Sequence, residues 1–260
     1  REIKNKISSA KNEMMSIDSF AKVEFDHKVV EVYKEYQQKL KNGNSVDFDD
    51  LLILPIKLFR NYPRVLEEYQ DRYKYILIDE YQDTNEAQYT FSKLLSAKYR
   101  NIFVVGDNDQ AIYAFRGANY KNILNFEKDY PEAKTILLEE NYRSTKTILN
   151  AANSVIKNNH ERKDKNLWSN NAVGNKIKYK EVANEKEEAS FVGTEIKRLL
   201  SEGINEEDIA VLYRTNAQSR VIEEEMLKKN IKYRVVGSFY FYNRKEIKDL
   251  LCYLRLINNH

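Results

Sequence analysis

Apolar residues recur at three- and four-residue spacing in several stretches, the pattern of helices with one buried face. In residues 22–42 the repeat is formed by Phe25, Val29, Tyr33, Tyr36 and Leu40. Gly43 follows this repeat at a position where helices commonly end. Further helices are predicted over residues 49–59, 86–97, 185–200, 217–229 and 244–257.

Short apolar runs lie between these helices, and each has the length of a buried strand. The runs cover residues 73–80, 101–107, 133–140, 176–182, 208–214 and 232–237. Strands that alternate with helices predict a parallel α/β sheet. A polar stretch, residues 157–176, separates the first three runs from the last three and is interpreted as an excursion or a linker between two sheets. The pattern therefore predicts two α/β units behind a helical lead-in.

Composition adds limits on the class of protein. Seven Gly and three Pro among 260 residues leave few helix breakers, so a helix-rich chain is expected. A net charge of +3 does not by itself indicate nucleic-acid binding, and any basic patch must be local. One cysteine, Cys252, excludes an intrachain disulfide, which favours a reducing compartment, the cytoplasm. The longest apolar run, residues 51–56, is too short to span a membrane.

Two carboxylates directly follow the first apolar run. Asp79 and Glu80 would lie at the carboxyl end of a strand, where ligands bind in open parallel sheets. Asp79 is a candidate ligand for the Mg²⁺ of a bound nucleotide. Glu80 is a candidate to orient an attacking water and take its proton. Acidic turn residues also end many apolar strands, so this stretch alone leaves the simpler alternative open.

The second run continues into VVGDNDQAIYAFRGA, residues Val104–Ala118. Gln110 would lie near the same sheet edge, as a neutral donor able to sense a γ-phosphate. Two rings and a cation follow it, and these groups are suited to stacking bases and holding a phosphate backbone: Tyr113, Phe115 and Arg116. Core aromatic residues beside a solvated Arg would give the same spacing, so the spacing does not decide.

The third run leads into EENYRSTKTIL, residues Glu139–Leu149. Ser144 or Thr145 would cap the following helix. Tyr142 is a candidate to stack on a nucleobase, and Arg143 to reach a γ-phosphate as an arginine finger does. A capped helix with an exposed Arg is the alternative for this stretch.

Six stretches, in order, resemble the motifs of superfamily 1A DNA helicases of the PcrA/UvrD/Rep group. They are VDFDD (46–50), DEYQDTN (79–85), VVGDNDQAIYAFRGA (104–118), ENYRST (140–145), VLYRTNAQSR (211–220) and FYNRKEIKDLLCYLRL (241–256). The resemblance extends over essentially the whole chain. It implies a motor of two RecA-like parallel-sheet domains of the P-loop NTPase type. ATP would bind in the cleft between the domains, and single-stranded DNA would cross both.

The resemblance assigns roles by position. It implies that Asp79 is the Mg²⁺ ligand and Glu80 the catalytic base. Gln110 matches the residue that couples the γ-phosphate to DNA, Arg143 a γ-phosphate arginine, and Tyr142 the ring near adenine. The implied DNA-contacting residues are Tyr113, Phe115, Arg116, Arg214 and Asn216. Phe115 replaces the Trp usual in the family, and a Phe still offers a stacking face.

The P-loop of this family, GxxxxGK followed by Ser or Thr, is not found in the sequence, since none of the seven Gly precedes a Lys. The later Arg-bearing motif of the family is also not found. We therefore expect a central fragment with incomplete sheets that does not turn over ATP alone and is marginally stable or self-associates. Its expected parts are a helical remnant of an inserted subdomain (1–44), the C-terminal part of the first RecA-like domain (45–140), the N-terminal part of the second (141–250) and the start of a second insertion (251–260).

The function that the resemblance implies is an ATP-dependent 3′–5′ DNA helicase acting in DNA repair and plasmid replication. It would use ATP and Mg²⁺ and act on single-stranded DNA and its junctions with duplex. Two alternatives are a non-catalytic single-strand-binding or regulatory module, and the helicase subunit of a helicase–nuclease. A binding module gives no reason for Asp79, Glu80, Gln110 and Arg143 to coincide, which favours the helicase. The sequence does not specify protein partners.

Overall fold

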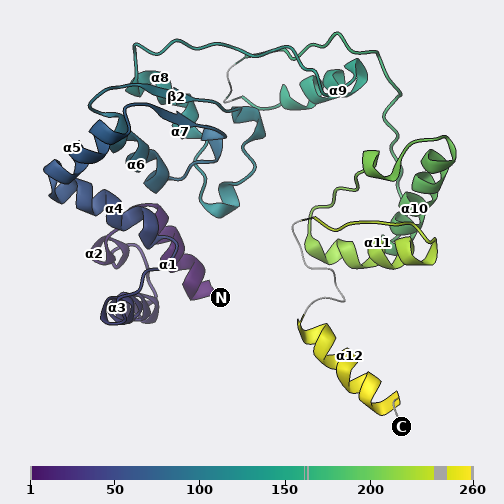
Figure 1. The fold of residues 1–260 in the computed structure, drawn as a ribbon, viewed down its shortest axis with the longest axis horizontal. Helices are drawn as coiled ribbons and strands as arrows, with labels where there is room; N and C mark the ends of the chain where they lie inside the picture. Colours follow the sequence, from purple (N-terminus) through teal and green to yellow (C-terminus); the bar gives the residue numbers. More distant parts are fainter. Residues whose placement is uncertain (1, 161, 163, 237–244, 259–260) are drawn as a thin grey trace. The chain divides into compact units, whose positions relative to one another are not determined.

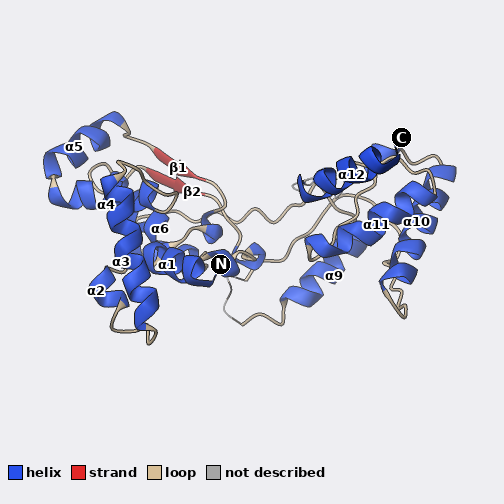
Figure 2. Cartoon of the chain, turned by 90° about the horizontal axis from the view of Figure 1, so that it is seen from below, coloured by secondary structure: helices blue, strands red, loops and turns tan. Residues whose placement is uncertain are grey.

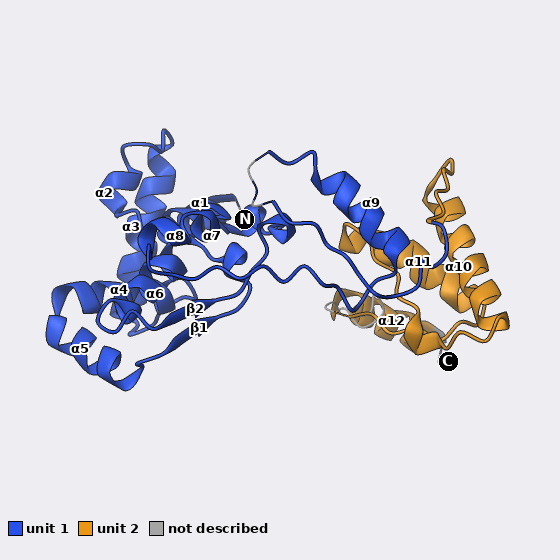
Figure 3. Ribbon diagram, turned by 90° about the horizontal axis from the view of Figure 1, so that it is seen from above, with its two compact units in different colours: residues 1–176 blue, residues 177–260 orange. Residues whose placement is uncertain are grey.

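The computed structural model describes residues 2–160, 162, 164–236 and 245–258 (Figure 1). The chain divides into two compact units, Arg1–Lys176 and Ile177–His260 (Figure 3). Helices make up most of the regular structure, and two short strands lie side by side in the first unit (Figure 2). The α/β class predicted from the sequence is confirmed, with a smaller sheet than expected.

Most of the first unit is helical. Its helices are α1 (Glu2–Asn12), α2 (Ile17–Phe20), α3 (His27–Asn42), α4 (Asp50–Asn61), α5 (Pro63–Arg72), α6 (Glu86–Ser96), α7 (Lys121–Leu124), α8 (Phe126–Asp129) and α9 (Lys146–Ile156). Three 3₁₀ turns join them: η1 (Tyr81–Asp83), η2 (Asn108–Gln110) and η3 (Ala114–Arg116). The helix predicted over 22–42 begins only at His27, because Asp26 caps it by accepting a hydrogen bond from the Lys28 N–H.

The second unit contains α10 (Glu185–Ser201), η4 (Glu206–Asp208), α11 (Asn216–Lys228) and α12 (Lys245–Asn258). These three helices confirm the sequence prediction to within a residue at each end among the described positions. Ile196 of α10 and Met226 of α11 are buried against Ile231. No helix among the described residues is long and apolar enough to cross a membrane.

A two-stranded parallel sheet lies in the first unit. Strands β1 (Ile76–Ile78) and β2 (Ile102–Val104) pair in register, with Leu77 opposite Phe103. These strands confirm the predictions over 73–80 and 101–107 as shorter elements.

The other four predicted strands are wrong for the described residues. Segments 133–140, 176–182, 208–214 and 232–236 form no strand there, and residue 237 lies outside the described residues. One isolated bridge pairs Glu140 with Trp168. A strand needs a neighbour to take its backbone hydrogen bonds, and apart from this bridge none pairs with these segments among the described residues. Several of their apolar side chains stay exposed, as the exposed fractions of Leu138 (79%), Tyr179 (86%) and Leu212 (94%) show.

Two small apolar cores hold the first unit together. One joins α1, α2 and α3 and consists of Ile7, Ala10, Phe20, Val29, Val30 and Tyr33. The other joins α4 and α6 through Ile53, Ile56 and Ala87. Phe25, which the spacing placed on the buried face of a helix, precedes α3 and is 94% exposed. The second core packs α6, the helix that follows η1, against α4.

Candidate functional site

The carboxyl ends of β1 and β2 meet, as the parallel arrangement predicts. The Val105 N–H donates to the Ile78 carbonyl at 2.9 Å, and the Tyr81 N–H donates to the Val105 carbonyl at 2.9 Å. Asp79 and Glu80 lie between these two contacts, at the edge of the sheet. Both side chains are exposed there.

A tight turn orients the second carboxylate. Glu80 has a φ of 51°, in the left-handed region that non-glycine residues seldom occupy. Its N–H donates to Asp79 Oδ1 at 2.9 Å. Its Oε2 accepts a hydrogen bond from Gln82 Nε2 at 2.7 Å. One hydrogen bond therefore fixes the Glu80 backbone, and the other fixes its carboxylate.

Gln82 links the two strand ends. Its side chain is 1% exposed, and its Oε1 accepts from the Asp107 N–H at 2.9 Å. A Cβ at position 106 would lie 2.5 Å from this oxygen, so only glycine lets the chain after β2 approach Gln82 so closely. No local sequence signal indicates that the Gln82 side chain points inward, so its role could not be predicted.

The turn after β2 contains the next link. Asp107 Oδ1 accepts from the Asp109 N–H at 2.9 Å, and Oδ2 accepts from Gln110 Nε2 at 2.9 Å. Burial raises the pKa of the Asp107 carboxyl, but hydrogen bonds from Lys165 and Gln110 outweigh it, so the pKa lies below its usual value.

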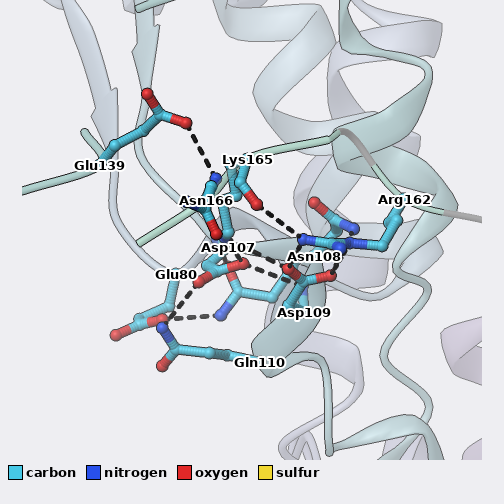
Figure 4. Close-up of polar contacts among 10 residues, drawn as sticks. Glu80, Asp107, Asn108, Asp109, Gln110, Glu139, Arg162, Lys165 and Asn166 are labelled. Atoms are coloured by element: carbon cyan, nitrogen blue, oxygen red, sulfur yellow. Dashed lines mark hydrogen bonds and ion pairs between the residues drawn. The ribbon is translucent and has the colours of Figure 1, made fainter. Parts of the chain in front are cut away.

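Four residues thus form one hydrogen-bonded series, which we call the polar chain: Glu80, Gln82, Asp107 and Gln110. Asp107 contributes its backbone N–H to Gln82 and its carboxylate to Gln110. Figure 4 labels three of its members, Glu80, Asp107 and Gln110, together with two neighbouring cations, Arg162 and Lys165. Glu80 and Gln110 were singled out from separate stretches of sequence, and the structure brings them together.

Described residues of the polar segment 157–176 contact this turn, a contact that the sequence did not predict. Arg162 Nε and Nη2 donate to the two oxygens of Asp109 at 3.2 and 3.0 Å. Lys165 forms an ion pair with Asp107 and lies 3.6 Å from Asp109 Oδ2. The Asn166 N–H donates to Glu139 Oε1 at 2.9 Å. No sequence signal identified these cations, because charged residues in a polar stretch are usually solvated.

A cavity of about 370 Å³ opens beside the two carboxylates. Its lining comes from β1, η1 and α6 and includes Asp79, Glu80 and Asp83. Asp83 Oδ1 is buried with no hydrogen-bond partner among the described residues. Burial, and then the charge of Glu80, raise the pKa of the Asp83 carboxyl.

The described residues contain no cluster of three or more acidic, His or Cys side chains placed to bind a metal. A nucleotide-bound Mg²⁺ needs only one or two protein carboxylates, since phosphates and waters complete its octahedron. Asp79, with the unpartnered oxygen of Asp83 lining the same cavity, fits that requirement. The donor set does not suit an ion held by protein ligands alone.

The aromatic residues after Gln110 form an exposed group. The Tyr113 and Phe115 rings lie 6.0 Å apart, and the Arg116 guanidinium lies 5.1 Å and 5.5 Å from their centroids. Phe115 is 68% exposed, which excludes the alternative of a core aromatic. A cavity of about 440 Å³ adjoins it, lined by Phe115 on one side and by α1 residues such as Asn12 on the other.

Tyr142 and Arg143 lie before α9, and no contact among the described residues joins them to the polar chain. Tyr142 is 79% exposed and donates through its hydroxyl to Glu140 Oε2 at 2.8 Å. The Arg143 N–H donates to Asn141 Oδ1 at 3.0 Å, and the Arg143 side chain is exposed.

The expected side-chain cap of α9 is wrong. Thr145 occupies the N-cap position without a side-chain cap, and the Ser144 N–H instead donates to Asn141. The first N–H groups of α9, those of Lys146 and Thr147, donate to the carbonyls of residues 172 and 173 at 3.1 and 3.0 Å. A neighbouring stretch of backbone therefore takes the place of a cap.

Arg214 and Asn216 belong to the second unit. Thr215 and Gln218 form a capping box at the start of α11. The Arg214 N–H also donates to Gln218 Oε1 at 3.0 Å. Asn216 is the first residue of this helix. The two residues thus lie at a well-defined helix start.

Comparison with known families divides the chain in two. Residues 1–131 match the UvrD/REP helicase N-terminal domain. Residues 136–260 match the UvrD-like helicase C-terminal domain. Together the two matches cover nearly every residue.

Individual relatives agree with these matches. The chain is 56% identical over 263 residues to the ATP-dependent DNA helicase PcrA of Bacillus subtilis (strain 168), covering 100% of this chain and 36% of the relative. It is 56% identical over 256 residues to the protein of the same name from Staphylococcus aureus (strain Mu50 / ATCC 700699), covering 97% and 35%. The chain spans about a third of the length of these curated relatives. It belongs to the UvrD/Rep family of helicases.

Proposed function

We propose that the protein containing this chain is an ATP-driven DNA helicase that moves 3′ to 5′ along single-stranded DNA and unwinds duplex at junctions. The observation that supports this most is the polar chain, which joins Glu80 to Gln110 across two strand ends. In a motor, a hydrogen-bonded path between the catalytic base and the residue that senses the γ-phosphate would let each respond to the other. Relatives at 56% identity are named ATP-dependent DNA helicases.

The carboxylates at the sheet edge would serve the nucleotide. Asp79 would hold Mg²⁺, which supplies neutralisation of the phosphate charge. Glu80 would orient the attacking water and accept its proton, with Gln82 fixing its orientation. Gln110 would sense the γ-phosphate. Tyr142 would stack on adenine, and Arg143 would stabilise the charge on the transferred group.

The exposed group of rings would contact DNA. Tyr113 and Phe115 offer faces on which bases stack, and Arg116 adds a cation for the phosphate backbone. Arg214 and Asn216 would be the second unit's contribution. Because η3 follows η2 after only three residues, a shift at Gln110 has a short path to the rings.

Further expectations belong to the same proposal. The part boundaries at residues 44, 140 and 250, a cytoplasmic location, and roles in repair and plasmid replication rest on the resemblance. Exposed apolar side chains on the sheet support self-association, since Leu77 and Phe103 are 72% and 59% exposed.

A second candidate is a single-strand-binding module without hydrolysis. The observation that favours it for the isolated chain is that none of its seven Gly precedes a Lys. We therefore expect that the isolated 260 residues show no steady ATP hydrolysis. Hydrolysis by the isolated chain that vanished with Glu80→Gln would refute this expectation.

A chimera tests the proposal in a complete motor. This chain replaces the aligned segment of the Bacillus subtilis relative, and ATP hydrolysis is measured with and without single-stranded DNA. Glu80→Gln should lower turnover by roughly 10²- to 10⁴-fold, the usual loss of a general base. The matched control is Glu67→Gln, since Glu67 is an exposed carboxylate on α5 that pairs with Lys98.

The proposal predicts full hydrolysis in the control and DNA stimulation in the unsubstituted chimera. Hydrolysis at an unchanged rate in Glu80→Gln would show that Glu80 is not the general base. A chimera that binds DNA without hydrolysing ATP would favour the binding module.

A further inference from the structure

Two cations of the segment 157–176 have side chains that are largely shielded from water. The side chains of Arg162 and Lys165 are 8% and 14% exposed, and Asp109 opposite them is 8% exposed. Charged side chains leave water only when they are paired, because an unpaired buried charge strongly destabilises the folded state. Burial at these positions therefore requires the carboxylates of the turn after β2.

The nearest carboxylate differs between the two cations. Arg162 makes a two-pronged contact with Asp109, and its Nη2 also donates to the Lys165 carbonyl at 3.2 Å. Lys165 pairs with Asp107 through Oδ1, while Gln110 Nε2 donates to Oδ2 of the same carboxylate. One carboxylate thus lies between Lys165 and the amide of Gln110.

We propose that Lys165 and Arg162 are positioning residues that fix the Asp107–Gln110 turn and, through the polar chain, the Gln110 amide and the Glu80 carboxylate. The consequence for ATP hydrolysis rests on the function proposed above, whereas the positioning itself does not. The segment that follows α9 therefore takes part in the site.

The physical reason lies in what each cation prevents. Without Lys165, the half-buried Asp107 carboxylate would keep only neutral donors and would turn toward water, which releases Gln110 Nε2. Loss of the Asp107 position also frees its N–H from Gln82, whose other end holds Glu80. Arg162 acts one step further away, through Asp109 and the Lys165 backbone. Lys165 should consequently have the larger effect on Gln110.

Side-chain amide NMR of the full chain, labelled only at glutamine, reports this directly. The chain has seven glutamines, so the spectrum is simple. Each signal is assigned by substituting one glutamine at a time and finding the signal that disappears. Lys165→Met should move the Gln110 and Gln82 signals, and Arg162→Met should move them less. Gln70, a buried amide that donates to the Leu94 carbonyl at 2.7 Å, should not move.

Controls separate positioning from general loss of charge or fold. Lys165→Arg retains the charge and should restore the Gln110 signal. Lys178→Met removes an ion pair with Glu195 in the second unit and should move none of the seven signals. Unmoved Gln110 and Gln82 signals in Lys165→Met would overturn the proposal. Loss of the Gln70 signal as well would also overturn it, because the pair would then be a determinant of the fold.

The chimera gives the catalytic readout. Lys165→Met should lower kcat by roughly 10- to 100-fold without changing KM for ATP, since misplacement of about 1 Å can cost 10²-fold. Lys165→Arg should recover most of the rate. The NMR measurement needs neither nucleotide nor DNA, so failure of the positioning role and failure of the proposed function are distinguishable. An unchanged kcat with shifted amides would refute the link to hydrolysis.

Discussion

Gln82→Glu tests the centre of the polar chain with a nearly isosteric change. Gln82 donates to Glu80 Oε2 at 2.7 Å and accepts from the Asp107 N–H at 2.9 Å. The substitution keeps the acceptor and replaces the donor with a carboxyl oxygen. Two carboxyl groups would then face each other, one of them at a position that is 1% exposed. They can share the site only while one of them holds a proton.

The loss of stability follows from the short distance between the Glu80 carboxylate and the carboxyl introduced at position 82. Two charges about 4 Å apart repel by about 4 kcal/mol at an effective dielectric constant of 20. The introduced carboxyl has its pKa raised in the folded state above an unfolded value of about 4.3. The contribution of the protonated carboxyl to the free energy of unfolding is therefore fully present below about pH 4. It is lost as the pH rises through the raised pKa of the folded state. At about 1.4 kcal/mol per pKa unit, the loss should extend to roughly neutral pH.

The assay is urea unfolding at pH 4 and pH 8, followed by the fluorescence of the single tryptophan, Trp168, in the first unit. Gln82→Glu should be close to the unsubstituted chain at pH 4. At pH 8 it should lose about 4 kcal/mol, a fall of roughly 2 M in the urea midpoint for a slope of about 2 kcal/mol/M.

Gln88→Glu is the matched control, since Gln88 Oε1 accepts from the Asn85 N–H at the start of α6. A carboxylate serves that capping box equally well and favours a helix N-terminus, so the control should be neutral or slightly stabilising at pH 8. Equal destabilisation of Gln82→Glu at both pH values would refute the buried hydrogen bond from Gln82 to Glu80.

Two further substitutions test the packing around the site. Lys11→Met should cost about 3–5 kcal/mol in urea unfolding, because Lys11 is 3% exposed and pairs with Asp47 and Asp50 at 2.7 and 2.9 Å. A loss under about 1 kcal/mol would contradict that pairing. Gly106→Ala should cost about 1–3 kcal/mol and speed amide exchange in the turn after β2, because its Cβ would lie 2.5 Å from Gln82 Oε1. Unchanged exchange would show that Gln82 does not approach the backbone there.

Helices such as α3 and α10 could be predicted because their signals are local. The apolar repeat of α3 lies within the helix itself, whereas its start, set by the Asp26 cap, lies five residues after the predicted one. Strands depend on neighbours that the local sequence does not specify. Segments 133–140 and 208–214 have apolar runs like those of β1 and β2, yet only the latter two pair with each other in the described structure.

Some residues of the candidate site could likewise be predicted from local sequence, and others could not. Asp79, Glu80 and Gln110 could be found because each follows an apolar run whose carboxyl end must reach the sheet edge. Arg162 could not be found, since its partner Asp109 lies 53 positions away and its own surroundings in sequence are polar. The inward direction of Gln82 is likewise set by the close approach of Gly106, a tertiary property.

The central claim is that this chain contains the DNA track of a helicase next to the polar chain. Fluorescence anisotropy of a labelled oligo-dT, titrated with the chain at two salt concentrations, tests it most directly. The variant is Phe115→Ala with Arg116→Ala. The matched control is Arg72→Ala with Tyr73→Ala, because the Arg72 guanidinium likewise lies over a ring, 5.4 Å from the Tyr73 centroid.

Salt-sensitive binding with a Kd of roughly 10⁻⁶ to 10⁻⁴ M is expected. Stacking contributes about 1–3 kcal/mol per base, so the Phe115 and Arg116 double variant should bind roughly 5- to 150-fold more weakly. The Arg72 and Tyr73 control should bind as the unsubstituted chain does. Binding that is absent, or that both double variants retain equally, would contradict the claim.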